Sequence, residues 1–343
     1  MENLDLHREL EAFVEAIDTF PASEEKSKFY KLENIGLAQE SALLDNYLGE
    51  LEHRKALSLI LKAQEAISLC KKSEIELGFE KFNEVYSKIP SLSSEAGKYA
   101  NLYYLSGMAY YYFKIENYHK SLEFTWKELH ETEKLEKMGI TMLHYRRAGH
   151  VGNVIKILYK LGNIEEAVKL MLADLLYTLN GDTALMPQGE WNHELLNIIP
   201  YIRQRYFDIS FLNVTEKWIQ GRGNYKYNDT YIYNEVFSKI PEFEVTNNNL
   251  AMIYNWLYLQ KMYYQNFTNE FILNSIEFFR VPFDSSFDSL KLSVLSNIIK
   301  LLKHSEIEKN LKEKYGIQIN NYILNNLNSK QILKDNICNF IFE

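Results

Sequence analysis

The sequence predicts an all-α protein built as an α-solenoid of stacked helical hairpins. Apolar residues recur at the three- and four-residue spacing of helices through most of the 343 residues. With only 6 Pro and 14 Gly, the chain lacks the many turns of an all-β fold. The helical segments also follow one another in pairs joined by short turns. Such hairpins cannot bury their apolar faces alone, so we expect them to stack.

Residues 1–52 are expected to form an acidic N-terminal helical region. Apolar residues in 3–20 have helical spacing, and the Phe20-Pro21 pair ends that helix. Ser23 can cap a following helix over 24–50. The region holds 13 acidic residues against 4 basic ones, a local net charge of −9. Such a charge is typical of a solvated helical face, and it also suits a basic partner.

The repeats are expected over 53–220. A first helix over 54–70 is followed by Ser73 and Glu76, whose spacing predicts a capping box at the start of the next helix. The helix over 95–114 carries apolar and aromatic residues on every side, which is typical of a helix buried on more than one side. The remaining helices of the three hairpins are expected over 75–89, 117–136, 140–161 and 164–179.

The second half is less regular. The segment 181–189 reads as a loop, and the polar segment 221–229 is the best candidate for a domain boundary. Beyond it, 230–343 is expected to hold C-terminal helical repeats and a helical cap. The helices expected in this half are 190–205, 208–220, 230–239, 248–265, 269–280, 289–303, 305–314 and a pair after 317.

Small and large residues in the hairpins follow a repeated pattern. Two hairpins place a small residue, a large one a turn later, a large one at the turn and a small one in the second helix. These positions are Ala66, Leu69, Ile75 and Gly78 in one hairpin, and Ala109, Tyr112, Tyr118 and Ser121 in the next. Over about half of the chain the sequence therefore resembles tetratricopeptide-type (TPR-like) repeats, in a divergent form with a longer period than the usual ~34 residues.

The resemblance implies a concave groove lined by the first helix of each hairpin. Aromatic rings alternating with amines on that face would suit an extended peptide with apolar and acidic side chains. The alternative is that the aromatic side chains pack against neighbouring helices. The groove residues implied in this way are Tyr103, Tyr110, Phe113, Lys114, Tyr145, Lys156, Tyr159, Lys160, Tyr254, Lys261 and Tyr264.

The expected function is that of a non-enzymatic adaptor or regulator that binds a peptide or protein, with no catalytic residue and no cofactor. One alternative is an α-helical metal enzyme of di-iron type, because Glu-x-x-His pairs place a carboxylate and an imidazole on one helix face. The pairs considered for metal binding are Glu50 with His53 and Glu190 with His193. A structural assembly subunit is a further alternative.

Charge and composition restrict the partners. The net charge of −8 argues against a general nucleic-acid binder, which needs a basic surface. No stretch is apolar enough for a membrane span, and the N-terminus lacks the features of a signal peptide. Two cysteines do not make a disulfide framework, so we expect a cytoplasmic protein. Homo-oligomerisation is left open.

Overall fold

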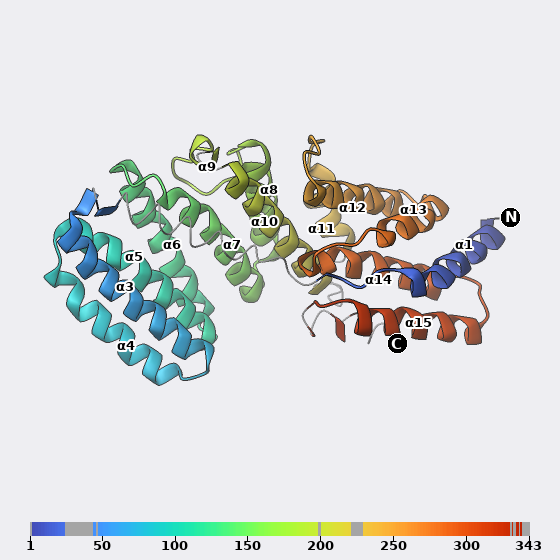
Figure 1. The fold of residues 1–343 in the computed structure, drawn as a ribbon, viewed down its shortest axis with the longest axis horizontal. Helices are drawn as coiled ribbons and strands as arrows, with labels where there is room; N and C mark the ends of the chain where they lie inside the picture. Colours follow the sequence, from blue (N-terminus) through green and yellow to red (C-terminus); the bar gives the residue numbers. More distant parts are fainter. Residues whose placement is uncertain are drawn as a thin grey trace. The chain divides into compact units, whose positions relative to one another are not determined.

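In the part of the chain that the computed structural model describes, the regular secondary structure consists of helices joined by turns and loops (Figure 1). The described residues are 2–24, 44–45, 47–197, 200–220, 229–329, 331, 334–335 and 337. Among them the only extended pairing is an isolated bridge between Glu24 and Asp284. The predicted all-α class is confirmed. Most of the helix expected over 24–50 lies outside the described residues.

The contacts divide the chain into two compact units. Unit 1 comprises Met1–Phe29 and Asp208–Glu343, and unit 2 comprises Tyr30–Phe207. The division falls within α10 (Pro200–Gln220). The N-terminal helix is therefore grouped with the C-terminal half and not with the hairpins that follow it in sequence. The domain boundaries expected at 52 and 220–230 stay predictions.

Unit 2 contains six helices at the positions where the sequence predicts the hairpin helices. Each helix packs against the next one in the chain, and α3 also packs against α5. The hairpin helices are α3 (Glu50–Lys71), α4 (Ile75–Lys88), α5 (Ser94–Lys114), α6 (Tyr118–Lys137), α7 (Leu143–Leu161) and α8 (Ile164–Asn180), followed by the short α9 (Glu194–Asn197). The ends agree with the sequence-based expectation to within a few residues.

Local polar groups set several of these ends. The Ser93 hydroxyl accepts a hydrogen bond from the backbone amide of Ala96, and the Asn117 side chain accepts one from Lys120, which caps α5 and α6. The capping box expected from Ser73 and Glu76 is not formed. Ser73 lies in the turn itself, at φ 68°, so Glu74 becomes the residue that precedes α4, and its side chain makes no cap.

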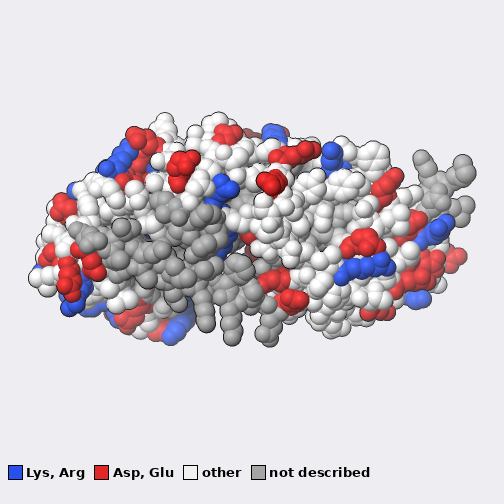
Figure 2. Space-filling model, turned by 45° about the horizontal axis from the view of Figure 1, so that its top comes forward, with Lys and Arg blue, Asp and Glu red and all other residues white. Residues whose placement is uncertain are grey.

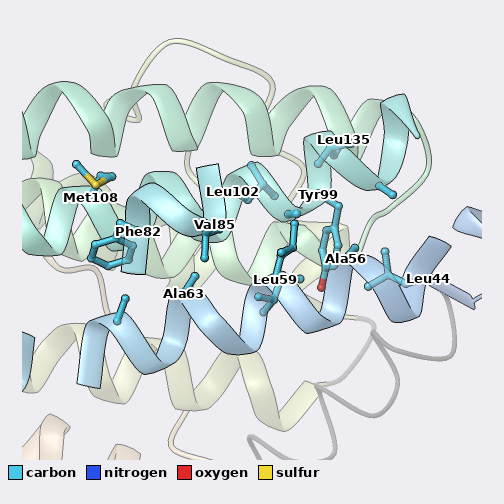
Figure 3. Packing of buried hydrophobic residues seen from close by; sticks show 14 of the residues in the cluster. Leu44, Ala56, Leu59, Ala63, Phe82, Val85, Tyr99, Leu102, Met108 and Leu135 are labelled. Carbon is cyan, nitrogen blue, oxygen red and sulfur yellow. The ribbon is translucent and has the colours of Figure 1, made fainter. Parts of the chain in front are cut away.

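The core of unit 2 lies between α3, α4 and α5. Figure 3 shows Phe82 and Val85 of α4 among buried side chains of the neighbouring helices. Gly107 of α5 makes this approach possible, since an added Cβ there would lie 2.2 Å from the Phe82 ring. Phe82 has no exposed surface, and truncating such a side chain to alanine costs about 3–5 kcal/mol.

Aromatic residues of α5 stack on rings of two neighbouring helices, α4 and α6. Tyr111 stacks on Phe79 of α4 with ring centroids 4.9 Å apart, and Tyr112 stacks on Phe124 of α6 at 5.3 Å. Offset aromatic pairs of this kind contribute about 0.5–1.5 kcal/mol beyond their buried area. As predicted from its sequence, α5 is buried on more than one side.

A buried arginine fastens the loop after α8 to unit 2. The Arg147 guanidinium donates to Glu133 at 3.0 Å, to Glu136 at 3.2 Å and to the backbone carbonyl of Glu190 at 2.7 Å. It also lies 4.1 Å from the ring centroid of Trp191. The guanidinium thus holds loop 181–193 through Glu190 and Trp191, while its bonds to α6 are charge-assisted and keep it in place.

Unit 1 is built around α14 (Asp288–His304), whose residues 288–299 are all buried. The helix α1 packs against α13 and α15, and α12 packs against α13 and α14. The bounds of the other helices are α1 (Glu2–Ala16), α11 (Asp229–Glu235), α12 (Asn248–Tyr264), α13 (Thr268–Arg280) and α15 (Lys309–Asn326). None of the helices in the described part of the chain is long and apolar enough to cross a membrane.

The segment after α1 is pinned inside unit 1. The Ser23 hydroxyl donates to the buried carboxylate of Asp288, and the backbone amide of Ser23 donates to the carbonyl of Asn326 at 2.8 Å. Asp288 also accepts the amide of Asn328 at 2.6 Å. The Ser23 hydroxyl thus contacts the first residue of α14, while the helix that Ser23 was expected to cap lies mostly outside the described residues.

Candidate binding site between α5 and α7

Unit 2 has a small open cavity between α5 and α7. The two helices both pack on α6, and the space left between them amounts to about 70 Å³. Short side chains from α5 and α6 leave this space unfilled: Ala109, Ser121 and Thr125. The rest of the lining consists of Ser106, Tyr110 and Phe113 of α5 with His150, Asn153, Lys156 and Ile157 of α7.

A buried carboxylate of α6 contacts His150, which lines the α7 side of this cavity. Glu128 has no exposed side-chain surface, and its carboxylate oxygens lie 2.8 Å from Arg146 Nε and 2.7 Å from His150 Nδ1. Burial by itself would raise the pKa of Glu128, but the charges of His150 and Arg146 outweigh it and hold the pKa below the ordinary 4.5. Glu128 therefore stays ionised and orients both partners.

Two cation–aromatic contacts join α7 to α5. The Arg146 guanidinium lies 4.1 Å from the ring centroid of Tyr103 and donates to the Ser106 hydroxyl at 2.6 Å. The Lys156 amine lies 4.5 Å from the ring centroid of Phe113. These contacts fix the two walls of the cavity relative to each other, and a cation over an aromatic face is electrostatically favourable.

The site is more basic than the chain as a whole. Arg146, His150 and Lys156 lie at or beside the cavity, whereas Glu128 is the acidic residue among its close contacts. The whole chain has a net charge of −8, and Figure 2 shows acidic and basic side chains interspersed over the visible face. A local surplus of basic groups favours a ligand that carries negative charge.

Three of the groove residues expected from the sequence meet at this cavity. Tyr110 and Phe113 form part of one wall, and Lys156 lies on the other. Tyr103 lies beside them under Arg146, with its hydroxyl 3.3 Å from that of Tyr99. Tyr103 and Tyr110 are half-buried and also pack against the core of unit 2. Tyr110 thus lines the cavity and also contacts the core, whereas Tyr103 contacts the core beside the cavity.

The other expected residues of unit 2 do not line the cavity. Lys114 and Lys160 are exposed in the last turns of α5 and α7, and Tyr159 is half-buried, with its pKa raised by burial. Tyr145 was expected in the groove but belongs to a small core cluster, where it is 7% exposed and its ring centroid lies 6.1 Å from that of Tyr206. Leu196 and Tyr206 pack against Tyr145 in this cluster, so its side chain is not available to the cavity.

The remaining three expected residues belong to unit 1. Tyr254 and Lys261 of α12 are exposed and line a separate cleft of that unit. Tyr264 is half-buried, with its ring stacked on Tyr233 at a centroid distance of 4.0 Å. These three residues therefore belong to unit 1 and do not line the cavity of unit 2.

Sequence reasoning missed the polar residues that complete the cavity. Glu128, Arg146, His150 and Asn153 are absent from the groove residues expected from the sequence. The available signal was spacing: Arg146, His150 and Asn153 recur at four- and three-residue steps, which places them on one helix face with Lys156. No spacing pattern within α6 indicates that Glu128 is buried, because its partners lie on α7.

The residues considered for a metal site form ion pairs or ring contacts with other side chains. His53 Nδ1 lies 2.6 Å from Asp45, and Glu50 pairs with Arg54. Glu190 lies 2.9 Å from the Lys137 amine, and the His193 ring contacts Tyr177. Within the ranges that the structure describes, no group of three or more His, Cys, Asp or Glu side chains could hold a metal ion.

Comparisons of the chain with protein-family models, with curated proteins and with solved structures gave no match.

Proposed function

We propose that the protein is a non-enzymatic helical-repeat adaptor that binds an extended segment of a partner protein along α5 and α7. The proposal treats α3–α8 as three TPR-like hairpins, in line with the sequence resemblance, and assumes the cytoplasmic setting expected from the cysteine content. The observation that carries it is the α5–α7 cavity, where Tyr110 and Phe113 face His150, Asn153 and Lys156.

The size of the cavity limits what can enter it. A site needs about 10–15 Å³ of such space per water molecule, so about 70 Å³ admits a group of roughly five to seven water-sized units. This is enough for the end of one side chain and too little for a folded element. We therefore expect the peptide backbone to lie over the opening and one side chain to enter.

Charge favours an acidic side chain at that position. A carboxylate would accept hydrogen bonds from the Lys156 amine and the Asn153 amide, and such charge-assisted bonds are about twice as strong as neutral ones. The rings of Tyr110 and Phe113 offer apolar contact to a neighbouring residue of the peptide. The recognised sequence would thus pair Asp or Glu with an apolar residue.

A display library of random peptides tests the proposal, with the full chain as bait. We expect enrichment of peptides in which Asp or Glu adjoins an apolar residue. The same selection on a Lys156→Glu variant should lose these peptides. Lys120→Glu is the matched control, because Lys120 also lies over a ring, 5.2 Å from the Tyr112 centroid, but does not line the cavity.

Three outcomes would contradict the proposal. The first is enrichment of the same peptides by the wild-type protein and by Lys156→Glu, which would place binding elsewhere. The second is the absence of any enriched motif over several rounds, with the fold of the bait confirmed by circular dichroism. The third is an equal loss of binding in Lys156→Glu and Lys120→Glu, which would show a general charge effect.

A further inference from the structure

Unit 1 contains a larger cleft of about 290 Å³ that is separate from the α5–α7 cavity. One wall is the exposed side of α12, with Tyr254, Tyr258 and Lys261. Another wall is formed by η4 (Phe237–Lys239) and the segment after it, which includes Glu242 and Phe243. The cleft thus lies entirely within one unit.

The two charged side chains of this cleft carry opposite signs and come from different walls. Lys261 extends from α12, and Glu242 extends from the segment after η4. Both are exposed, and neither forms an ion pair with any residue that the structure describes. By contrast, the neighbouring Lys239 and Glu235 do pair, at 2.6 Å. The cleft therefore offers one cationic and one anionic contact to the same bound molecule.

Aromatic and apolar surface lies between these charges. Tyr254 and Tyr258 are 40% and 49% exposed, and the Phe243 ring meets Tyr254 edge-on at a centroid distance of 5.9 Å. The inner wall includes the buried Phe237 and Tyr233. Exposed aromatic faces attract ammonium groups, and the inner wall suits an apolar side chain.

The volume sets the size of a suitable ligand. An engineered cavity of about 150 Å³ holds benzene, so about 290 Å³ holds a molecule of roughly twelve non-hydrogen atoms. A free α-amino acid with a large apolar side chain has this size, a carboxylate for Lys261 and an ammonium for Glu242. A capped peptide segment lacks both charges at its ends.

We propose that this cleft is a binding site for a free α-amino acid with a large apolar side chain. Lys261 binds the α-carboxylate, Glu242 binds the α-ammonium group against the tyrosine faces, and the side chain enters toward Phe237. The proposal does not rest on peptide binding by unit 2, because all of its residues belong to unit 1.

Isothermal titration of the full chain with L-phenylalanine, L-leucine, N-acetyl-L-phenylalanine and L-phenylalaninamide tests this site. We expect saturable binding of the two free amino acids and at least tenfold weaker binding of each blocked analogue. Glu242→Gln should weaken L-phenylalanine at least tenfold yet leave N-acetyl-L-phenylalanine unchanged. Lys261→Met should also weaken the binding of L-phenylalanine at least tenfold, and it should leave the binding of L-phenylalaninamide unchanged.

The matched control is Glu244→Gln, which makes the same charge change in the same segment at an exposed residue that does not line the cleft. It should bind L-phenylalanine like the wild type. The proposal is overturned if the blocked analogues bind as tightly as the free amino acids, or if Glu244→Gln matches Glu242→Gln. It is also overturned if neither free amino acid binds at about 10 mM, where even a millimolar site is mostly filled.

Discussion

Replacing Glu128 by alanine removes the carboxylate that joins α6 to α7 below the cavity. Glu128 is fully buried, and its partners Arg146 and His150 are only 19% and 16% exposed. Deleting one member of a buried ion pair costs about 3–5 kcal/mol, because the remaining charges are left without compensation. Since both partners can reach some water, we expect the lower end, about 3 kcal/mol. For a unit of this size that corresponds to a fall in Tm of about 6–12 °C.

Thermal unfolding followed by circular dichroism measures this effect, with Glu123→Ala as the matched control. Glu123 makes a 2.6 Å ion pair with Lys127 on the same helix but is 54% exposed, so its loss should cost less than about 1 kcal/mol. If Glu128→Ala and Glu123→Ala lower the Tm equally, the inferred role of the buried carboxylate is wrong.

The pH dependence of the unfolding free energy provides a second test with the same variant. The folded-state pKa of Glu128 lies below its ordinary 4.5, because His150 and Arg146 outweigh the effect of burial. The ionised form therefore stabilises the fold fully above that ordinary pKa, and the contribution is lost as the pH falls through the lower folded value. The stability difference between wild type and Glu128→Ala should narrow as the pH falls below about 4.5. A gap that widens toward acid would refute the reasoning.

Three further predictions concern other parts of the chain. Arg147→Met should release loop 181–193, seen as faster limited proteolysis there, and lower the unfolding free energy by about 3 kcal/mol or more; an unchanged cleavage pattern would contradict the anchoring role. Gly152→Ala should raise the unfolding free energy by about 0.5–1 kcal/mol, because an added Cβ meets nothing within 4 Å and alanine favours helix; a lower Tm would contradict it. Lys291→Met should raise the unfolding free energy measured in urea by about 1 kcal/mol. Burial lowers the pKa of Lys291, and its buried amine has no hydrogen-bond partner among the described residues. A lower unfolding free energy would contradict this prediction.

The helices of unit 2 could be predicted because their signals are local. Apolar residues spaced three or four positions apart mark the buried face of each helix. The side chain of Asn117 accepts a hydrogen bond from the backbone amide of Lys120, only three residues away. The predicted capping box at Ser73 failed for a related reason. Whether a serine caps a helix depends on where the turn places it, and here the turn gives Ser73 a positive φ.

The candidate site could be predicted only in part. Tyr110, Phe113 and Lys156 were found because repeat spacing assigns a helix face, but the same spacing put Tyr145 in the groove, although Tyr206 covers it. Local patterns cannot show which neighbour covers a face. The pairing of Arg146 with Glu128 likewise depends on how α6 lies beside α7.

Long-range packing escaped sequence analysis for the same physical reason. The ring of Phe13 in α1 lies 5.8 Å from that of Phe279 in α13, and no pattern within either helix specifies the other. Contacts between residues so far apart in the sequence depend on how all the apolar helix faces pack together.

A double-mutant cycle between Lys156 and the acidic residue of a selected peptide tests the central claim most directly. Fluorescence anisotropy would give the Kd for wild type and Lys156→Glu, each with the selected peptide and with a version in which Lys replaces the acid. We predict that each single change weakens binding at least tenfold and that the two together restore much of the lost affinity. Independent, additive losses would show that Lys156 does not contact the acidic side chain, and the proposed groove would be wrong.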